Sequence, residues 1–171
     1  MIPAIETERP TLRAPTMADF DGGAAFLATD RARFVGGPRE RHGAWRLFAA
    51  NLGQWPFKGH GMWAVEERAS RRHVGQVGAW HPEGWIAREI GWIILDPAAE
   101  GRGFAREAAE AARGFAYATL GWREVFSVID PDNACSAALA RRLDCTIERR
   151  EALPGGGVAD IWRHPPPEAS A

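Results

Sequence analysis

Apolar side chains recur at two different spacings along the chain, and the spacing indicates which segments form strands and which form helices. Short runs rich in apolar and β-branched residues predict strands at 11–13, 61–66, 73–80, 89–95, 125–129, 146–152 and 158–163. Apolar positions repeated every three or four residues predict helices at 16–30, 38–52, 103–120 and 133–143. We therefore expect a mixed α+β fold, with helices flanking a curved sheet of about six to seven strands.

Individual residues indicate where the first helices begin and end. Thr16 and Asp19 have the spacing of a capping box at the start of the first helix. Pro38 suits the first turn of the second helix, and we expect Gly53 and Pro56 to end it. The chain should thus open with a strand followed by two helices.

Composition and charge narrow the class of protein. The chain has 171 residues, 46% of them apolar and 25% charged, which is typical of one globular domain. A net charge of −1 gives no positive field for a nucleic-acid backbone, so we expect no nucleic-acid partner. No stretch approaches the roughly 20 apolar residues of a membrane span, and no apolar leader precedes the first strand. We expect a cytoplasmic protein without membrane contact, whose tail at 165–171 is frayed.

The loop before the longest predicted helix carries the clearest chemical pattern. Gly101 and Gly103 stand where that helix begins, and the unpaired N–H groups of a helix start favour a phosphate or pyrophosphate. Arg102 either adds a charged contact to the phosphate or points to solvent. A tight turn selected only for packing is the alternative for the glycine pair.

Two other nucleotide-binding folds fit this loop poorly. A P-loop needs Lys followed by Ser or Thr after its last glycine, and Phe104 and Ala105 stand there instead. A dinucleotide-binding fold has its glycine motif in the first βα turn, whereas this loop comes late in the chain.

The loop resembles the motif of the GNAT acyltransferases, which is a polar residue, two variable positions, Gly, one variable position, and then Gly or Ala. Glu100, Gly103 and Ala105 occupy these places, although Gln or Arg is usual where Glu100 stands. Further matches follow in order along nearly the whole chain, at 6–13, 19–20, 89–92 and 130–143. Together they are similar to the RimJ/RimL-type branch of the family.

The resemblance implies one GNAT domain over residues 1–164, whose mostly antiparallel sheet has a V-shaped splay between strands 4 and 5, at 89–95 and 125–129. Acetyl-CoA would bind there as cosubstrate, with its pantetheine on the first of these strands and its pyrophosphate on the glycine loop. Asn133 would either reach the cosubstrate with its amide or serve as an ordinary helix N-cap. The implied cofactor-binding residues are Ile93, Ile94, Leu95, Gly101, Arg102, Gly103, Phe104, Ala105 and Asn133.

Acyl transfer to an amine needs a general base and a donor to the leaving thiolate. Glu89 is the expected base, because partial burial at the start of an apolar strand raises the pKa of a carboxyl. The alternative is a strand-edge glutamate paired with Arg88 or with solvent. Ser136 is the expected donor, or else a structural serine. Ala140 stands where many GNAT enzymes have a tyrosine, and the sole tyrosine, Tyr117, lies elsewhere.

The expected function is direct acetyl transfer from acetyl-CoA to a primary amine, on either a protein N-terminus or a small molecule. A covalent route through Cys135 is disfavoured because no histidine lies near it in the sequence. The histidines show no ligand spacing, so we expect no metal. The alternatives are a scaffold that binds acyl-CoA without catalysis and a peptide-binding protein without cofactor. A homodimer is compatible with the resemblance, and the sequence does not identify the amine.

Overall fold

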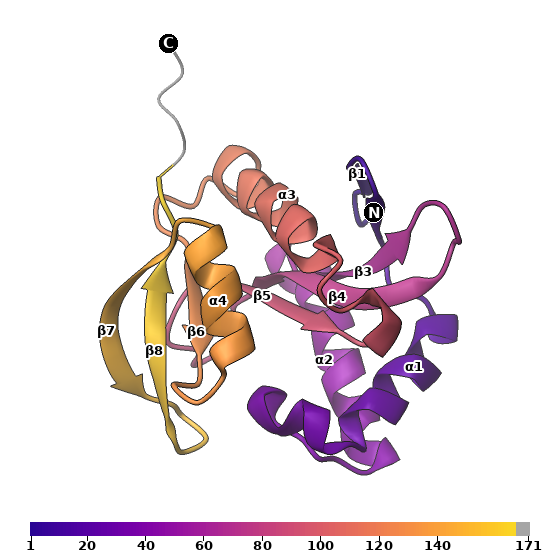
Figure 1. Cartoon of the computed structure of the whole chain (residues 1–171), viewed down its shortest axis with the longest axis horizontal. Helices are drawn as coiled ribbons and strands as arrows, with labels where there is room; N and C mark the ends of the chain where they lie inside the picture. Colours follow the sequence, from indigo (N-terminus) through magenta and orange to yellow (C-terminus); the bar gives the residue numbers. More distant parts are fainter. Residues whose placement is uncertain (167–171) are drawn as a thin grey trace.

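The predicted strands join one open sheet in the computed structural model, which describes residues 1–166 (Figure 1). The strands are β1 (Ile5–Glu6), β2 (Pro10–Arg13), β3 (Met62–Glu67), β4 (His73–Trp80), β5 (Glu89–Ile94), β6 (Phe126–Ile129), β7 (Thr146–Ala152) and β8 (Val158–Arg163). Their order in the sheet is β1-β2-β3-β4-β5-β6-β8-β7. Neighbours run antiparallel except β5 and β6, which are parallel. The mixed α+β fold with a mostly antiparallel sheet is confirmed.

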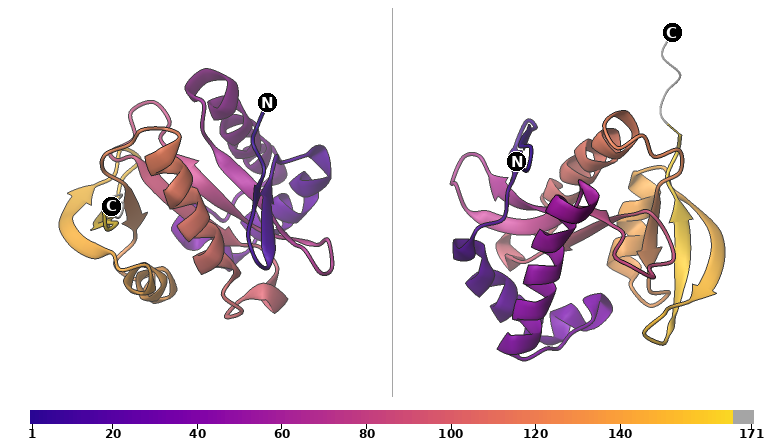
Figure 2. Two further views of the ribbon diagram at one scale, coloured as in Figure 1. Left: turned by 90° about the horizontal axis from the view of Figure 1, so that it is seen from above. Right: turned by 180° about the vertical axis from the view of Figure 1, so that it is seen from behind.

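Helices cover both faces of this sheet (Figures 1 and 2). They are α1 (Met17–Leu27), α2 (Arg41–Lys58), α3 (Phe104–Ala118) and α4 (Ala134–Arg142), with short 3-10 helices η1 (Asp30–Val35) and η2 (Pro97–Ala99). On one face, α1 and α2 pack against Ile93 and Leu95. On the other, α3 and α4 pack against Ile90, Trp92 and Ile94. None of the helices in the described part of the chain has the length and apolar character to cross a bilayer.

The sheet has eight strands, where about six to seven were expected. The additional strand, β1, is two residues long and pairs Ile5 with Leu12 and Glu6 with Thr11. Because so short a segment contains no apolar run, its strand conformation depends on pairing with β2 and is not visible in its own sequence.

The first helix begins as predicted and the second ends later than predicted. The N–H of Thr16 donates to the Asp19 carboxylate at 2.7 Å, which completes the capping box. However, α2 begins after Pro38 and runs past Pro56 to its end at Lys58, so the expected boundaries of this helix were wrong. Because proline has no N–H, one backbone hydrogen bond is lost at Pro56, and only two residues of α2 follow it.

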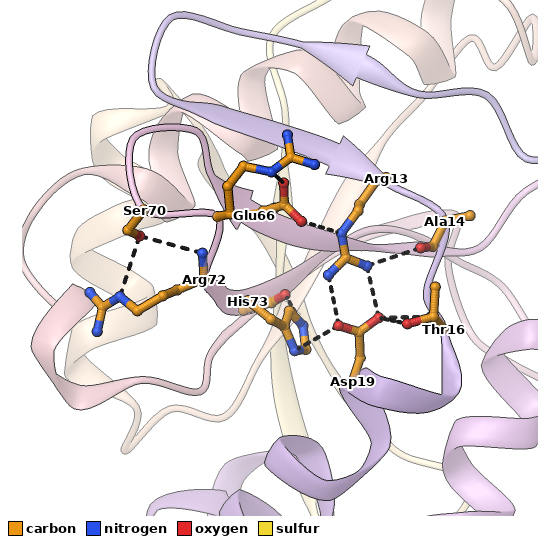
Figure 3. A network of polar contacts seen from close by, with 10 residues as sticks. Arg13, Ala14, Thr16, Asp19, Glu66, Ser70, Arg72 and His73 are labelled. Atoms are coloured by element: carbon orange, nitrogen blue, oxygen red, sulfur yellow. Dashed lines mark hydrogen bonds and ion pairs between the residues drawn. The ribbon is translucent and has the colours of Figure 1, made fainter.

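A polar network joins α1 to the sheet (Figure 3). Arg13 of β2 donates to both carboxylate oxygens of Asp19 at 2.8 Å and to Glu66 of β3 at 2.7 Å. His73 of β4 lies 3.4 Å from the same Asp19 carboxylate. Burial opposes ionisation of Asp19, but hydrogen bonds from Arg13 and the Thr16 amide outweigh it and lower the pKa to about 2. The charged carboxylate thus fixes the helix that forms one wall of the site described below.

The last described residues are held against the domain. His164 is 2% exposed, and the hydroxyl of Tyr117 donates to the carbonyl of Pro165 at 2.7 Å. Of the tail predicted at 165–171, residues 167–171 lie outside the described residues.

Candidate functional site

The parallel strands β5 and β6 are paired at a single register position, where Glu89 lies opposite Phe126. Beyond this position, hydrogen bonds that involve side chains join the two strands in place of main-chain pairing. The hydroxyl of Ser127 donates to the carbonyl of Ile90 at 2.6 Å, and the N–H of Val128 donates to the Glu89 carboxylate at 3.4 Å. The strands β5 and β6 then separate, which confirms the V-shaped splay expected between the strands at 89–95 and 125–129.

The splay leaves an open main-chain edge along β5. The N–H of Leu95 donates to β4 at 2.9 Å, whereas the carbonyl of Ile90 faces β6. Because successive residues of a strand direct their backbone groups to alternate sides, Trp92 and Ile94 face the splay. Of the three residues expected on the pantetheine, Ile94 thus contributes its N–H to the open edge, because its carbonyl accepts a hydrogen bond from Arg31 at 3.1 Å. Ile93 and Leu95 direct side chains to the opposite face of the sheet from Ile94.

A cavity of about 620 Å³ adjoins the splay. Its walls include residues of α1, η1, α2, β4, β5, β6, the start of α4, and the loops between β4 and β5 and between β7 and β8. They are rich in aromatic side chains, namely Phe20, Phe26, Phe34, Phe48, Trp80, Trp85 and Trp92. The cavity brings together five of the predicted site residues, Glu89, Ile93, Leu95, Asn133 and Ser136. Apolar walls with a few placed polar groups are typical of sites for small ligands or single side chains.

Glu89 lies half-buried where the cavity meets the splay. Its Oε2 accepts a hydrogen bond from the indole N–H of Trp85 at 2.7 Å, and its Oε1 accepts the longer bond from β6. Burial outweighs these two bonds and raises the pKa of Glu89 to about 7. Arg88 stacks on the Trp122 ring and makes no ion pair with Glu89 within residues 1–166. This environment suits a proton acceptor better than a solvated edge charge.

Ser136 and Asn133 lie at the start of α4, across the splay from β5. The hydroxyl of Ser136 accepts a hydrogen bond from the indole N–H of Trp92 at 3.2 Å, which leaves its own proton available for donation. The side-chain oxygen of Asn133 accepts from the N–H of Ser136 at 3.1 Å, so Asn133 is the N-cap of α4. Its amide NH₂ has no hydrogen-bond acceptor among the described residues, and the N-cap geometry is compatible with a ligand contact as well.

The glycine loop forms at the start of α3, away from the cavity walls. Gly101 and Gly103 have φ values of 71° and 86°, a region that favours glycine. A side chain at Gly101 would meet nothing within 4 Å, so its backbone is open to a ligand. Arg102 is not free in solvent, because it pairs with Glu67 at 2.7 Å and stacks over Phe104. An accessible loop backbone at the N-terminus of a 15-residue helix fits a diphosphate group.

A buried pair that the sequence did not predict lies at the point where the splay opens. Nε2 of His164 is 2.9 Å from Oγ of Ser127, and both residues are almost fully buried. Because the Ser127 proton is donated to Ile90, His164 must donate through Nε2. Burial lowers the pKa of His164 to about 3, so the ring is neutral. The pair joins β6 to the end of β8 across 37 residues, and no local pattern signals it.

Comparisons with known proteins agree with this geometry. Residues 9–146 match the family model for the acetyltransferase (GNAT) domain. The structure is similar to an acetyltransferase from Agrobacterium tumefaciens, with 35% identity, a TM-score of 0.89 and coverage of 96% of this chain and 95% of that one. A putative GNAT-family acetyltransferase from Bordetella pertussis is 24% identical, with a TM-score of 0.78 over 95% and 99% of the two chains. RimL, a ribosomal alpha-N-protein acetyltransferase solved in complex with coenzyme A, is 17% identical, with a TM-score of 0.75 over 95% and 97%.

Proposed function

The chain belongs to the GNAT acetyltransferase family, and from this premise we propose that it transfers an acetyl group from acetyl-CoA to a primary amine. The acceptor is a protein N-terminus or a small molecule, bound in the aromatic cavity. The likeness to RimL supports a place in the RimJ/RimL-like branch. One domain over 1–164 carries the activity. Cys135 and Cys145 are free thiols, which fits work in the reducing cytoplasm.

The observation that carries the proposal is the position and pKa of Glu89. An ammonium group must lose a proton before its nitrogen can attack an acyl carbon, and a base whose pKa lies near the working pH serves this best. Glu89 has a pKa of about 7 and lines the cavity beside the splay. It therefore takes the proton from the acceptor, directly or through one water.

The splay and the glycine loop suit the two halves of acetyl-CoA, which supplies the acetyl group as a reactive thioester. The open strand edge at Trp92 and Ile94 holds the pantetheine. Ile93 and Leu95 line the acceptor cavity on the other side of the sheet. The loop at 101–105 receives the diphosphate through backbone N–H groups and the positive end of the α3 dipole. Asn133 donates its free amide N–H to the same molecule.

Ser136 hydrogen-bonds the departing sulfur. It lies across the splay from β5, and its accepted bond from Trp92 orients the hydroxyl while leaving its proton free. A thiolate is stable enough that one hydrogen bond suffices, because the pKa of a free thiol is only about 8.5. This arrangement accounts for a site in which Ala140 stands where a tyrosine is common.

A scaffold that binds acyl-CoA without catalysis is the second candidate, and it rests on the absent tyrosine and on Glu100. The environment of Glu89 favours the enzyme instead. Burying a carboxyl costs free energy, and binding of acyl-CoA alone gives no reason for a base with a raised pKa inside an acceptor-sized cavity.

Calorimetric titration with acetyl-CoA tests the cosubstrate site. Gly101→Glu places a carboxylate in the loop, and Gly84→Glu is its matched control. Both glycines have positive φ, 71° and 75°, and neither has an atom within 4 Å of an added Cβ, so strain and charge are the same in the two variants. We expect wild type and Gly84→Glu to bind and Gly101→Glu to lose at least about tenfold in affinity.

Release of the CoA thiol in the presence of a panel of primary amines then tests turnover. Amine-dependent release supports the enzyme. Saturable binding without release for any amine supports the scaffold, and no binding by wild type overturns the acyl-CoA proposal altogether.

A further inference from the structure

Glu100 places a negative charge directly before the loop that is proposed to receive a diphosphate. It is the C-terminal cap of η2, and its side chain is 56% exposed. A carboxylate beside a diphosphate repels it, and the repulsion acts over several ångströms in water. A loop with Glu at this place therefore needs a compensating positive charge to bind such a ligand well.

Arg31 supplies that charge from a distant part of the chain. It belongs to η1 and forms an ion pair with Glu100, 69 residues later in the sequence. The same guanidinium donates to the carbonyl of Leu95 at 2.9 Å and to the carbonyl of Ile94 at 3.1 Å. It also stacks over the ring of Phe26 at 5.1 Å. These contacts fix its position between the open edge of β5 and the glycine loop.

We propose that Arg31 is a further binding determinant for the acyl-CoA diphosphate, because its guanidinium cancels the charge of Glu100 beside the loop at 101–105. The inference rests on the proposed function, since it concerns the same cosubstrate. The Arg31 and Glu100 pair thus takes the place of the neutral or positive residue that is usual at the first motif position. Arg31 belongs to η1, which also contributes Arg33 and Phe34 to the cavity wall, so the cosubstrate end and the acceptor end share one element.

A purely structural role for Arg31, in which it only ties η1 to β5, makes a different prediction. Loss of a tie lowers stability, and neutralising Glu100 does not restore it. Loss of charge compensation weakens binding of a ligand that carries a diphosphate, and neutralising Glu100 does restore it. The two roles therefore separate in a double-mutant cycle.

The experiment measures the Kd for CoA by calorimetry at low salt in wild type, Arg31→Met, Glu100→Gln and the double variant. We expect Arg31→Met to weaken binding about tenfold, the scale expected for one exposed uncompensated charge. Glu100→Gln alone should stay within about threefold of wild type, and the double variant should recover to within about threefold. The loss in Arg31→Met should shrink in 0.5 M salt, where a Debye length of only about 4 Å screens the repulsion.

A matched pair and a truncated ligand complete the design. Arg41 forms an exposed ion pair with Asp21 at 2.6 Å, so Arg41→Met removes the same charge away from the loop and should leave the Kd for CoA unchanged. S-acetylpantetheine lacks the diphosphate, and its Kd should be the same in wild type and Arg31→Met. Equal losses for both ligands, or no recovery in the double variant, would overturn the inference. No CoA binding by wild type would instead overturn the proposed function, and this inference with it.

Discussion

At the scale of single residues, the proposed chemistry depends on a balance of forces at Glu89. Two hydrogen bonds to its oxygens favour the ionised form, and burial disfavours it. Burial prevails and the pKa rises from 4.5 to about 7. At neutral pH both protonation states are therefore populated, and the ionised one is the form that accepts a proton from the acceptor amine.

The activity should consequently depend on pH through Glu89. Below pH 7 the carboxylate is progressively protonated, so kcat/KM should fall about tenfold per pH unit. Above pH 8 Glu89 is fully ionised, and kcat/KM should no longer rise with pH through this group. Glu89→Gln keeps the shape but cannot accept the proton, and should lower kcat by about 10² to 10⁴-fold. Glu83→Gln, at a fully exposed carboxylate nearby, is the control and should keep the wild-type profile. An acid limb with a midpoint near 4.5, or its survival in Glu89→Gln, would contradict the assignment.

The sequence allowed Glu89 and Ser136 to be proposed, because each occupies a recognisable place at the start of a strand or helix. Their surroundings could not be predicted in the same way. The partner of Ser136 is Trp92, 44 residues earlier, and the partner of Glu100 is Arg31, 69 residues earlier. Such contacts depend on sheet register and strand order, which a short window of sequence does not contain.

At the scale of elements, strand bounds followed well from apolar spacing and turn residues. The strands β7 and β8 have the predicted bounds because a proline and three glycines at 154–157 separate them. The end of α2 was mispredicted because contacts with β3 outweigh the local effect of Pro56. Asn51 accepts a hydrogen bond from the N–H of Met62 at 2.7 Å, and Trp55 packs edge-on against Trp63 at 4.8 Å. Tertiary packing of this kind overrides local propensity.

The meeting of β5, β6 and β8 is held by the buried pair of Ser127 and His164. Ser127→Ala should lower the free energy of unfolding by about 1–3 kcal/mol, because it leaves the carbonyl of Ile90 and Nε2 of His164 without partners. Once His164→Phe has removed the ring nitrogens, the added cost of Ser127→Ala should be smaller by at least about 0.5 kcal/mol. Urea denaturation of the two single variants and the double variant measures this coupling. The control, Ser70→Ala in an exposed turn, should lower the free energy of unfolding by less than about 1 kcal/mol. Additive losses of stability for the Ser127 and His164 variants would show that the pair does not act as a unit.

At the scale of the whole molecule, the proposed site lies where two parts of the fold meet (Figures 1 and 2). The strands β1 to β5 form the longer part of the sheet, and β6, β8 and β7 continue it beyond the splay. The open edge and the glycine loop belong to β5 and the start of α3, whereas Asn133 and Ser136 come with α4 from the other side. The two parts share one core through α3 and α4, and main-chain pairing between β5 and β6 is limited to one register position.

A ligand that contacts both sides of the splay should therefore stabilise the entire domain. Because it binds only the folded chain, acetyl-CoA at 100 times its Kd should add about 2.7 kcal/mol. For a domain of this size the gain corresponds to a rise in Tm of roughly 5–10 °C. Scanning calorimetry over a series of acetyl-CoA concentrations should show the rise in wild type and in Gly84→Glu. At the same acetyl-CoA concentration, a tenfold loss of affinity in Gly101→Glu should cut the gain to about 1.4 kcal/mol, so the rise in Tm should be at most about half that of Gly84→Glu, which carries the same strain and charge. A rise of equal size in all three proteins would place the ligand away from the loop at 101–105, whereas a smaller rise in Gly101→Glu alone ties global stability to the diphosphate end of the site.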